Sequence, residues 1–328
     1  MSIRPEHRQA SPVGVGETVV AFDVGGTDMK SALFDTHGTL LGLRRTSTPL
    51  SGEHTAEAVL DRVAEITADY AREFPGVVPR AAGLLVPGLV DDDRGIGVLA
   101  SNLGWRDVPF KRLAEERLGV PVAFSHDVRG AGEAEFRLGA ARPFTDVAIM
   151  VIGTGIAGAI FVDGHPHLAG GFAGEIGHSI VIPDGPLCAC GGRGHLEAIA
   201  SAGAIARRYN ERTGLAVDGS RDVLARAQAG DEIAGAVWRE AIEALALSIS
   251  QLVALLAPDA VVIGGGLAQA GPALFDPLIA ELERLLTFHR RPRLVPAQIG
   301  ENAGLIGAAL RARDLVVNGA PADRPVAS

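Results

Sequence analysis

Hydrophobic and polar residues follow one another in two kinds of run, which predict short strands and amphipathic helices in the first half of the chain. Apolar, β-branched runs bounded by glycine or proline are typical of strands, and apolar residues three or four apart are typical of helices. We predict strands over 18–24, 31–35, 80–88 and 120–127. We predict helices over 54–73, 109–118 and 128–140. The first two strands flank a Gly-Gly-Thr turn, which predicts a hairpin.

The strand, glycine turn and strand pattern returns at 147–164, "VAIMVIGTGIAGAIFVDG". A shift of 127 positions lays Gly26-Thr27 on Gly153-Thr154, a short match that favours an internal duplication. Further helices are predicted over 199–213, 221–229, 231–257, 273–287 and 303–316. Further strands are predicted over 259–266 and 293–299. Strands and helices in alternation predict an α/β fold.

Composition bounds the class of protein. The 328 residues exceed what one small core needs, so we expect two lobes. The net charge is −9 without a cluster of Lys and Arg, which argues against a nucleic-acid partner. No apolar run is as long as a membrane span, and the N-terminal residues lack the apolar stretch of a secretory signal. Two cysteines cannot form a disulfide framework, so we expect a cytoplasmic protein.

The turn "DVGGTDMK" at 23–30 has the chemistry of a phosphate site, although it lacks the spacing of a P-loop. Gly25 and Gly26 expose backbone N–H groups, and Thr27 adds a hydroxyl donor. Lys30 could place a cation nearby, and Asp23 could hold a magnesium ion through water. The alternative is a purely structural hairpin turn.

Two further glycine turns strengthen the phosphate interpretation. Gly153, Thr154 and Gly155 repeat the first turn, so two hairpin tips could clamp the phosphates of one nucleotide from both sides. A third turn, at Gly264, Gly265 and Gly266, follows a predicted strand and precedes a predicted helix. It could be part of a dinucleotide-binding fingerprint, but the second Gly-x-x-Gly spacing and the expected acidic residue are missing. We interpret it as a turn beside adenosine.

Both cysteines stand two positions apart in "GHSIVIPDGPLCACGGRGHLE", residues 177–197. Cys188, Cys190, His178 and His195 offer the thiolate and imidazole ligands that tetrahedral zinc prefers. Glycines at 191, 192 and 194 would let the loop fold back so that His195 reaches the ion. The alternative is a pair of incidental thiols with surface histidines. Four protein ligands would indicate a structural ion rather than a catalytic one.

Carboxylates stand beside these features. Asp127 ends a predicted strand directly after Ser125-His126, where it could accept a proton from a hydroxyl nucleophile. It could instead only cap the following helix. Glu175 and Glu197 flank the Cys/His segment and could point at a hydroxylated ligand or simply face solvent.

Taken together, these features resemble the ROK (repressor, open reading frame, kinase) family of sugar kinases over residues 18–316. The motifs stand in the family's order: "DVGGTDMK", "SNLGW", "SHD", "GTGIAG", "GEIGH", "CACGGRGHLE" and "GGGL". The resemblance implies an actin-like ATPase (ribonuclease-H-like) fold, with two α/β lobes around a nucleotide cleft. It implies a polar tail at 1–17, an N-terminal lobe at 18–126 joined by the helix at 303–316, a C-terminal lobe at 127–302 with the zinc loop 177–197, and a tail at 317–328.

The resemblance also implies roles for individual residues. Asp127 becomes the base that deprotonates the sugar hydroxyl, and it binds the sugar with Asn102, Glu175, His178 and Glu197. The three glycine turns bind ATP with Mg²⁺, and zinc sets the sugar-binding His178 and Glu197 in place. A homodimer or higher homo-oligomer is expected from the family.

Two residues depart from the family pattern. His195 replaces a third cysteine, which changes the ligand set but still suits zinc. His126 replaces the usual Asn before the catalytic Asp, and this change could alter the sugar contacts or the pKa of Asp127.

The predicted activity is ATP-dependent transfer of the γ-phosphoryl group to O6 of a hexose. Glucose is the first expectation, followed by mannose, fructose and N-acetylated hexosamines, and polyphosphate is an open alternative to ATP as donor. A sugar-sensing regulator of the same family is the alternative function, although about 17 residues before the first strand are too few for a helix-turn-helix domain. A dinucleotide oxidoreductase would rest on the glycines at 264–266 alone.

Overall fold

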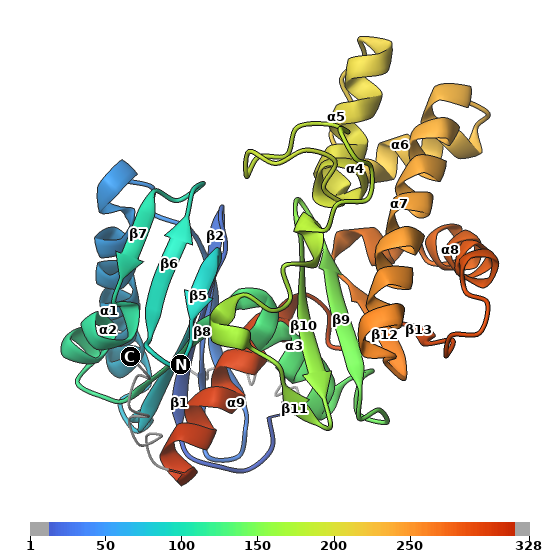
Figure 1. The fold of residues 1–328 in the computed structure, drawn as a ribbon. Helices are drawn as coiled ribbons and strands as arrows, with labels where there is room; N and C mark the ends of the chain where they lie inside the picture. Colours follow the sequence, from blue (N-terminus) through green and yellow to red (C-terminus); the bar gives the residue numbers. More distant parts are fainter. Residues whose placement is uncertain (1–12, 319–328) are drawn as a thin grey trace, which may run out of the picture. The chain divides into compact units, whose positions relative to one another are not determined.

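A computed structural model describes residues 13–318 of the chain, and contacts within it define two compact units. Unit 1 comprises residues 1–134 and 302–328, and unit 2 comprises residues 135–301. Each unit is shown in Figure 1. The predicted boundary after residue 126 lies at the start of helix α3, Asp127–Leu138, whereas the contacts divide the chain inside that helix. Asp127 therefore belongs to unit 1.

Unit 1 is built on a five-stranded sheet in the order β3-β2-β1-β4-β8. The strands are β1 (Val19–Val24), β2 (Asp28–Phe34), β3 (Leu40–Ser47), β4 (Ala81–Val86) and β8 (Val122–His126). β1 and β2 form the predicted antiparallel hairpin, and β4 and β8 continue the sheet in parallel. The sequence pattern missed β3, an edge strand whose outward positions include the polar residues Arg45 and Ser47.

Helices α1 (Thr55–Glu73), α2 (Phe110–Leu118), α3 and α9 (Ala303–Asn318) pack on this sheet. They confirm the four predicted helices, with ends shifted by a few residues. Glycine is required where α9 crosses β4, since a Cβ at Gly83 would lie 2.0 Å from the carbonyl oxygen of Ala308. This close approach brings the C-terminal helix onto the first sheet.

A small sheet of three short strands extends unit 1. It consists of β5 (Leu89–Asp91), β6 (Ile96–Ala100) and β7 (Trp105–Val108). Its apolar side chains join the core of unit 1, where Trp105 meets Phe110 edge to face at 5.0 Å. The loop between β6 and β7 carries Asn102, so this sheet positions one predicted sugar ligand.

Residues 13–17 of the predicted N-terminal tail are held by α9. Buried Arg313 donates hydrogen bonds to the carbonyl oxygens of Val13, Gly14, Glu17 and Asp35. Four backbone acceptors offset the cost of burying the guanidinium group. The rest of that tail, and residues 319–328 of the predicted C-terminal tail, lie outside the described residues.

Unit 2 repeats the topology of unit 1 with a sheet in the order β11-β10-β9-β12-β13. Its strands are β9 (Val147–Ile152), β10 (Ile156–Val162), β11 (His165–Pro166), β12 (Ala260–Gly264) and β13 (Arg293–Pro296). β9, β10 and β11 pair antiparallel, while β12 and β13 continue the sheet in parallel. Strand order and strand sense therefore match unit 1, which supports the predicted duplication.

Helices form the remaining core of unit 2. They are α4 (Glu197–Ala200), α5 (Ala202–Thr213), α6 (Ser220–Gln228), α7 (Glu232–Leu256) and α8 (Pro272–Leu285). The helix predicted over 199–213 is broken at Ser201, whose extended backbone and side-chain oxygen cap α5 by accepting from the Ala204 N–H. Asp231 caps α7 in the same way.

Short 3-10 turns complete the element order: η1 (Gly52–His54), η2 (Ala169–Gly171), η3 (Ile176–His178), η4 (Gly266–Ala270) and η5 (Gly300–Asn302). Among residues 13–318, no helix combines the length and the apolar character that crossing a membrane would need.

Candidate functional site

The first glycine tip, residues 25–27, joins β1 to β2 and is fastened to the start of the chain segment after β3. The Gly25 N–H donates to the carbonyl of Asp28 at 2.8 Å. Thr48, which is buried, donates from its backbone to the Thr27 carbonyl and from its hydroxyl to the Gly25 carbonyl, both at 2.8 Å. The tip is therefore rigid, and Asn102 lies against it, because a Cβ on Gly26 would be 3.2 Å from the Asn102 Nδ2.

Asp23 and Lys30 flank this tip on paired positions of β1 and β2. A Cβ on Gly304, in the first turn of α9, would lie 2.5 Å from the Asp23 carboxylate, so this carboxylate lies against the positive end of the helix dipole. Burial, and secondly the charge of Asp127, raise the pKa of Asp23 to about 7, while Lys30 lowers it. Two carboxylates and an ammonium group therefore share one region of unit 1.

Asp127 begins α3 directly after β8. Its Oδ1 accepts a 2.6 Å hydrogen bond from the Val128 N–H and lies 3.2 Å from the Nε2 of His126. Burial raises the pKa of Asp127 to about 7, and the Val128 N–H and Arg129 oppose this rise. A carboxyl group with such a pKa can take up a proton near neutral pH. Its partner is the next residue, whereas the helix cap of the alternative interpretation would accept from an N–H two or three residues further on.

Arg129 connects Asp127 to the strands that carry Asn102, a connection that the sequence did not reveal. Its Nε lies 3.0 Å from Asp92 Oδ2, and both side chains are buried. Its terminal nitrogen also donates to the Val90 carbonyl at 2.7 Å. The pair thus ties the β5–β6 turn to the first turn of α3. The available signal in the sequence was a pair of opposite charges: Arg129, two positions after Asp127, and Asp92 in the turn "DDDRG".

The second glycine tip, residues 153–155, joins β9 to β10 and is fastened to α4 and α5. The Ala202 N–H donates to the Gly153 carbonyl at 2.8 Å. Glu197 accepts the Ile156 N–H on its Oε2, also at 2.8 Å. Glycine is required at 155, since a Cβ there would lie 2.5 Å from this carboxylate oxygen. A predicted sugar ligand therefore holds a predicted phosphate tip.

The third glycine turn ends β12 and leads into η4. Gly265 has a φ of +81°, and a Cβ there would lie 2.4 Å from the Ile152 carbonyl oxygen. Beside it, Gly266 has open space where a side chain would stand, and Gly264 touches only Ala297 closely. The positive φ and the close approach to β9 explain why glycine is needed at 265. The open space at Gly266 leaves room for a ligand.

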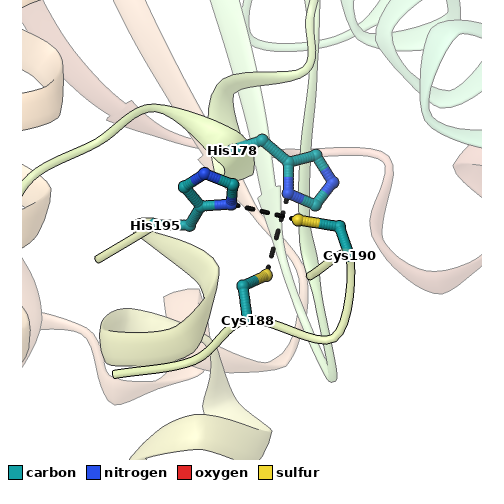
Figure 2. Close-up of side chains that lie close together, drawn as sticks. All are labelled: His178, Cys188, Cys190 and His195. Carbon is teal, nitrogen blue, oxygen red and sulfur yellow. Dashed lines mark hydrogen bonds between the residues drawn. The ribbon is translucent and has the colours of Figure 1, made fainter. Parts of the chain in front are cut away.

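His178, Cys188, Cys190 and His195 come together in unit 2 as the sequence predicted. Their ligand atoms all lie within 4.8 Å of one another. Figure 2 shows Cys188 next to His178 and Cys190 next to His195, each pair joined by a dashed line. Cys188 Sγ lies 3.9 Å from His178 Nδ1, and Cys190 Sγ lies 3.2 Å from His195 Nδ1. Tetrahedral zinc would place such atoms about 3.6 Å apart, given its bond lengths to sulfur and nitrogen. The cluster could therefore hold a metal ion.

Local backbone geometry brings the four ligands together. η3 presents His178, and paired bridges at Ile180–His195 and Leu187–Arg193 fold the loop back on itself. A Cβ on Gly192 would lie 2.3 Å from the His195 ring, so glycine gives the imidazole its place. Burial raises the pKa of the Cys188 thiol, and the charge of Cys190 raises it further. A bound cation would offset that cost and favour both thiolates.

Glu175 and Glu197 lie next to the metal cluster. His178 turns its Nδ1 toward Cys188, and its Nε2 lies 3.8 Å from Glu175 Oε2. Glu197 places its Oε1 4.0 Å from Cys188 Sγ. Carboxylates around metal-ligating side chains orient those ligands. Unit 2 thus gathers three of the predicted sugar ligands with the metal cluster, while unit 1 gathers Asn102 with Asp127.

Comparison with known proteins agrees with this geometry. The model of the ROK family matches residues 19–314. A glucokinase from Streptomyces coelicolor is 32% identical over 316 residues, covering 90% of this chain and 97% of that protein. The solved structure of a ROK hexokinase from Thermus thermophilus is 35% identical, with a TM-score of 0.79, and covers 92% of this chain and 100% of that one.

A ROK family glucokinase from Streptomyces griseus, solved in complex with glucose and AMPPNP, is 31% identical with a TM-score of 0.77. The alignment covers 90% of this chain and 99% of that structure. Two α/β units on sheets of one order, with these neighbours, define a protein of the actin-like ATPase fold, as the sequence predicted. Within that class, the chain belongs to the ROK family.

Proposed function

We propose that this protein is a sugar kinase that transfers the γ-phosphoryl group of ATP to O6 of glucose. The observation that carries the proposal is Asp127, a carboxyl group at the end of β8 whose pKa is raised to about 7. Membership of a family that includes glucokinases at 32% identity supports the reaction class. Glucose is inferred from the glucokinase relatives, and the role of Asp127 is inferred from its position after β8.

Asp127 acts as the base in this proposal. The sugar hydroxyl gives its proton to the carboxylate while its oxygen forms a bond to the γ-phosphorus, and ADP leaves with the electron pair of the broken bond. A base whose pKa lies near the working pH is ionised often enough to act and basic enough to accept the proton. Asn102, which lies against the first tip, would orient the same sugar.

The two glycine tips would bind the phosphates of ATP through backbone N–H groups. Lys30 would add a positive charge at the first tip, and Asp23 would hold a magnesium ion through bound water. Magnesium, when bound, neutralises the negative charge of the phosphates. Phosphoryl transfer relies mainly on such positioning and charge neutralisation, and the rigid tips meet that need. The third turn, with its open side at Gly266, would lie beside adenosine.

The four Cys and His ligands would hold zinc as a structural ion. Two thiolates and two imidazoles are a zinc-type donor set, and four protein ligands leave no open position for catalysis. The ion would fix the loop so that His178, through its Nε2, and Glu175 and Glu197 present polar atoms to the sugar hydroxyls. This arrangement is a preorganised binding loop.

The test is ADP release with Mg-ATP across glucose, mannose, fructose and N-acetylated hexosamines, with polyphosphate as a second donor. Asp127→Asn serves as the blank and should lower kcat by about 10²–10⁴-fold. Wild-type turnover of Asp127→Asn would disprove the assignment of the base. No turnover on any sugar by zinc-loaded protein that binds ATP would instead favour the sugar-sensing regulator.

A further inference from the structure

His126 is a buried side chain that the proposed reaction has not yet used. It ends β8, an edge strand of the unit 1 sheet, whose parallel pairing with β4 sets His126 opposite Val86. Only 8% of the side chain is exposed, and its Nε2 lies 3.2 Å from the Oδ1 of Asp127. The imidazole is therefore fixed by the strand and directed at the carboxylate.

The two contacts of Asp127 fall on the same carboxylate oxygen. The Val128 N–H donates to Oδ1 at 2.6 Å from one side, and the imidazole of His126 approaches Oδ1 from β8. Two donors on one oxygen fix the plane of a carboxylate. In the proposed reaction, the other oxygen, Oδ2, is then the one that accepts the proton of the sugar hydroxyl.

We propose that His126 is a positioning residue for the base: its Nε2–H donates to Asp127 Oδ1 and directs Oδ2 at the hydroxyl of the sugar. The inference rests on the proposed function, because it assigns Asp127 the role of base. His126 itself exchanges no proton with substrate in this scheme. In this scheme the Nε2 of His126 keeps its proton throughout the reaction.

The charged groups around Asp127 determine how its pKa would change if the His126 hydrogen bond were lost. Asp23 on β1 is a second carboxylate, and Lys30 on β2 partly balances it. Arg129 on α3 favours the ionised form of Asp127, while its own guanidinium group pairs with Asp92 beyond β5. A hydrogen bond donated to a carboxylate also favours its ionised form. Removing the His126 donor should therefore raise the pKa of Asp127.

Two variants of similar size distinguish the effect of losing the hydrogen-bond donor from the effect of changing the side-chain volume. His126→Gln carries an amide N–H at the end of its side chain, and His126→Leu carries no donor. We expect Gln to keep kcat within about threefold of wild type and Leu to lower it by about 10–100-fold, within the range of general-base catalysis. The KM for the sugar should change little, because His126 touches the base and not the substrate.

The pH profile gives a signature that a purely structural role would not produce. Activity is lost as pH falls through the pKa of the base, so the acid limb of kcat/KM should move to higher pH in His126→Leu, by about one unit. It should stay in place in His126→Gln. If His126→Leu raises the KM for sugar at unchanged kcat and unchanged acid limb, His126 binds the sugar directly and the proposal is wrong.

A measurement that does not use activity keeps this inference separate from the proposed function. Carbon-13 labelled aspartate carboxyls, with Asp127→Asn to assign the signal, give the titration midpoint of Asp127 by NMR. An upward shift of this midpoint in His126→Leu but not in His126→Gln supports the hydrogen bond even if no sugar is phosphorylated. Equal midpoints in wild type and His126→Leu would overturn it, and a circular-dichroism melt verifies that both variants fold.

Discussion

The two hairpin tips have the same topology but different chemistry. Each joins an antiparallel pair inside a five-stranded sheet of the same order, and each lies against a predicted sugar ligand of its own unit, Asn102 for the first tip and Glu197 for the second. The first is flanked by Asp23 and Lys30, whereas β9 and β10 carry no charged residue. A duplicated hairpin therefore provides one charged tip and one neutral tip.

The fastening of the tips differs as well. Thr48 holds the first tip through two hydrogen bonds, which come from the chain just after β3. Glu197 and the Ala202 N–H hold the second tip, and Glu197 also approaches the metal cluster. The second tip is thus connected to the predicted zinc loop of its own unit, whereas the bonds from Thr48 hold the first tip within unit 1. Variants that act on one tip only can test this division.

Among variants of the two tips, the largest effect is expected from Asp23→Asn, which removes the carboxylate of the charged tip. Loss of electrostatic preorganisation around the phosphates should lower kcat by about 10²–10³-fold. Stability should not fall with it, because burial makes the ionised form of Asp23 unfavourable. Steady-state kinetics at saturating Mg-ATP and a thermal melt measure both quantities. Met150→Leu, a volume-conserving change on β9, is the matched control and should keep full activity.

Removal of zinc should weaken sugar binding and loosen the second tip, and it should affect the first tip much less. Without the ion, the ligands His178 and Cys188 lose their common anchor, and Glu197 beside them loosens. We expect Cys188→Ser or prolonged chelation to raise the KM for the sugar by about tenfold or more, as metal-shell changes commonly do. Metal analysis should give one zinc per chain in the wild type.

The control measurement for zinc removal is the KM for ATP, which should rise less than the KM for the sugar. Equal losses for both substrates, with a collapse of the thermal transition, would show that the ion stabilises all of unit 2 and not one loop. Unchanged kinetics after complete zinc loss would remove the metal from the proposed function.

Local sequence predicted the parts of the fold that local pattern controls. The hairpin at β1 and β2, the buried strand β12 and the long helix α7 were confirmed, because apolar spacing and glycine turns are properties of neighbouring residues. The edge strand β3 and the short strands β5 to β7, which form a sheet of their own, lack a continuous apolar run. Their pairing depends on tertiary contacts, which local sequence does not show.

The same division applies to the candidate site. The Cys/His cluster lies within 18 residues of sequence, and its glycines explain its folding, so it could be predicted and was found. The Arg129–Asp92 pair and the bond from Ile156 to Glu197 join residues 37 and 41 positions apart. No local pattern shows such contacts. Neither does spacing reveal that His126 turns its ring toward the residue next to it.

Alanine substitutions at the second tip should lower kcat/KM for the sugar by an intermediate amount at position 155 and leave the KM for the sugar unchanged at position 153. A Cβ at Gly155 would meet Glu197 Oε2 at 2.5 Å, whereas Gly153 has open space. Gly155→Ala should therefore displace Glu197 and lower kcat/KM for the sugar by about tenfold, a loss of one good hydrogen bond to a charged group. Gly153→Ala, the matched control, should leave the KM for the sugar unchanged. Equal effects of both changes on the sugar would show that Glu197 does not connect the tip to it.

The smallest effect is the pH dependence of stability, and it belongs to unit 1. Asp23 and Asp127 both have pKa values raised from 3.8 to about 7 in the folded protein. Between these two values the folded state binds more protons than the unfolded state, so the free energy of unfolding falls as pH rises. Stability from these groups is complete below pH about 4 and is lost as pH passes through 7.

The measurement is urea unfolding at several pH values between about 4 and 8, for wild type and Asp23→Asn/Asp127→Asn. The double variant has no carboxyl at either position, so its decline over this range should be shallower than that of the wild type. The strands β9 and β10 of the second hairpin carry no carboxyl, so they add nothing to this slope. Parallel slopes for the two proteins would mean that Asp23 and Asp127 keep their ordinary pKa values in the folded state.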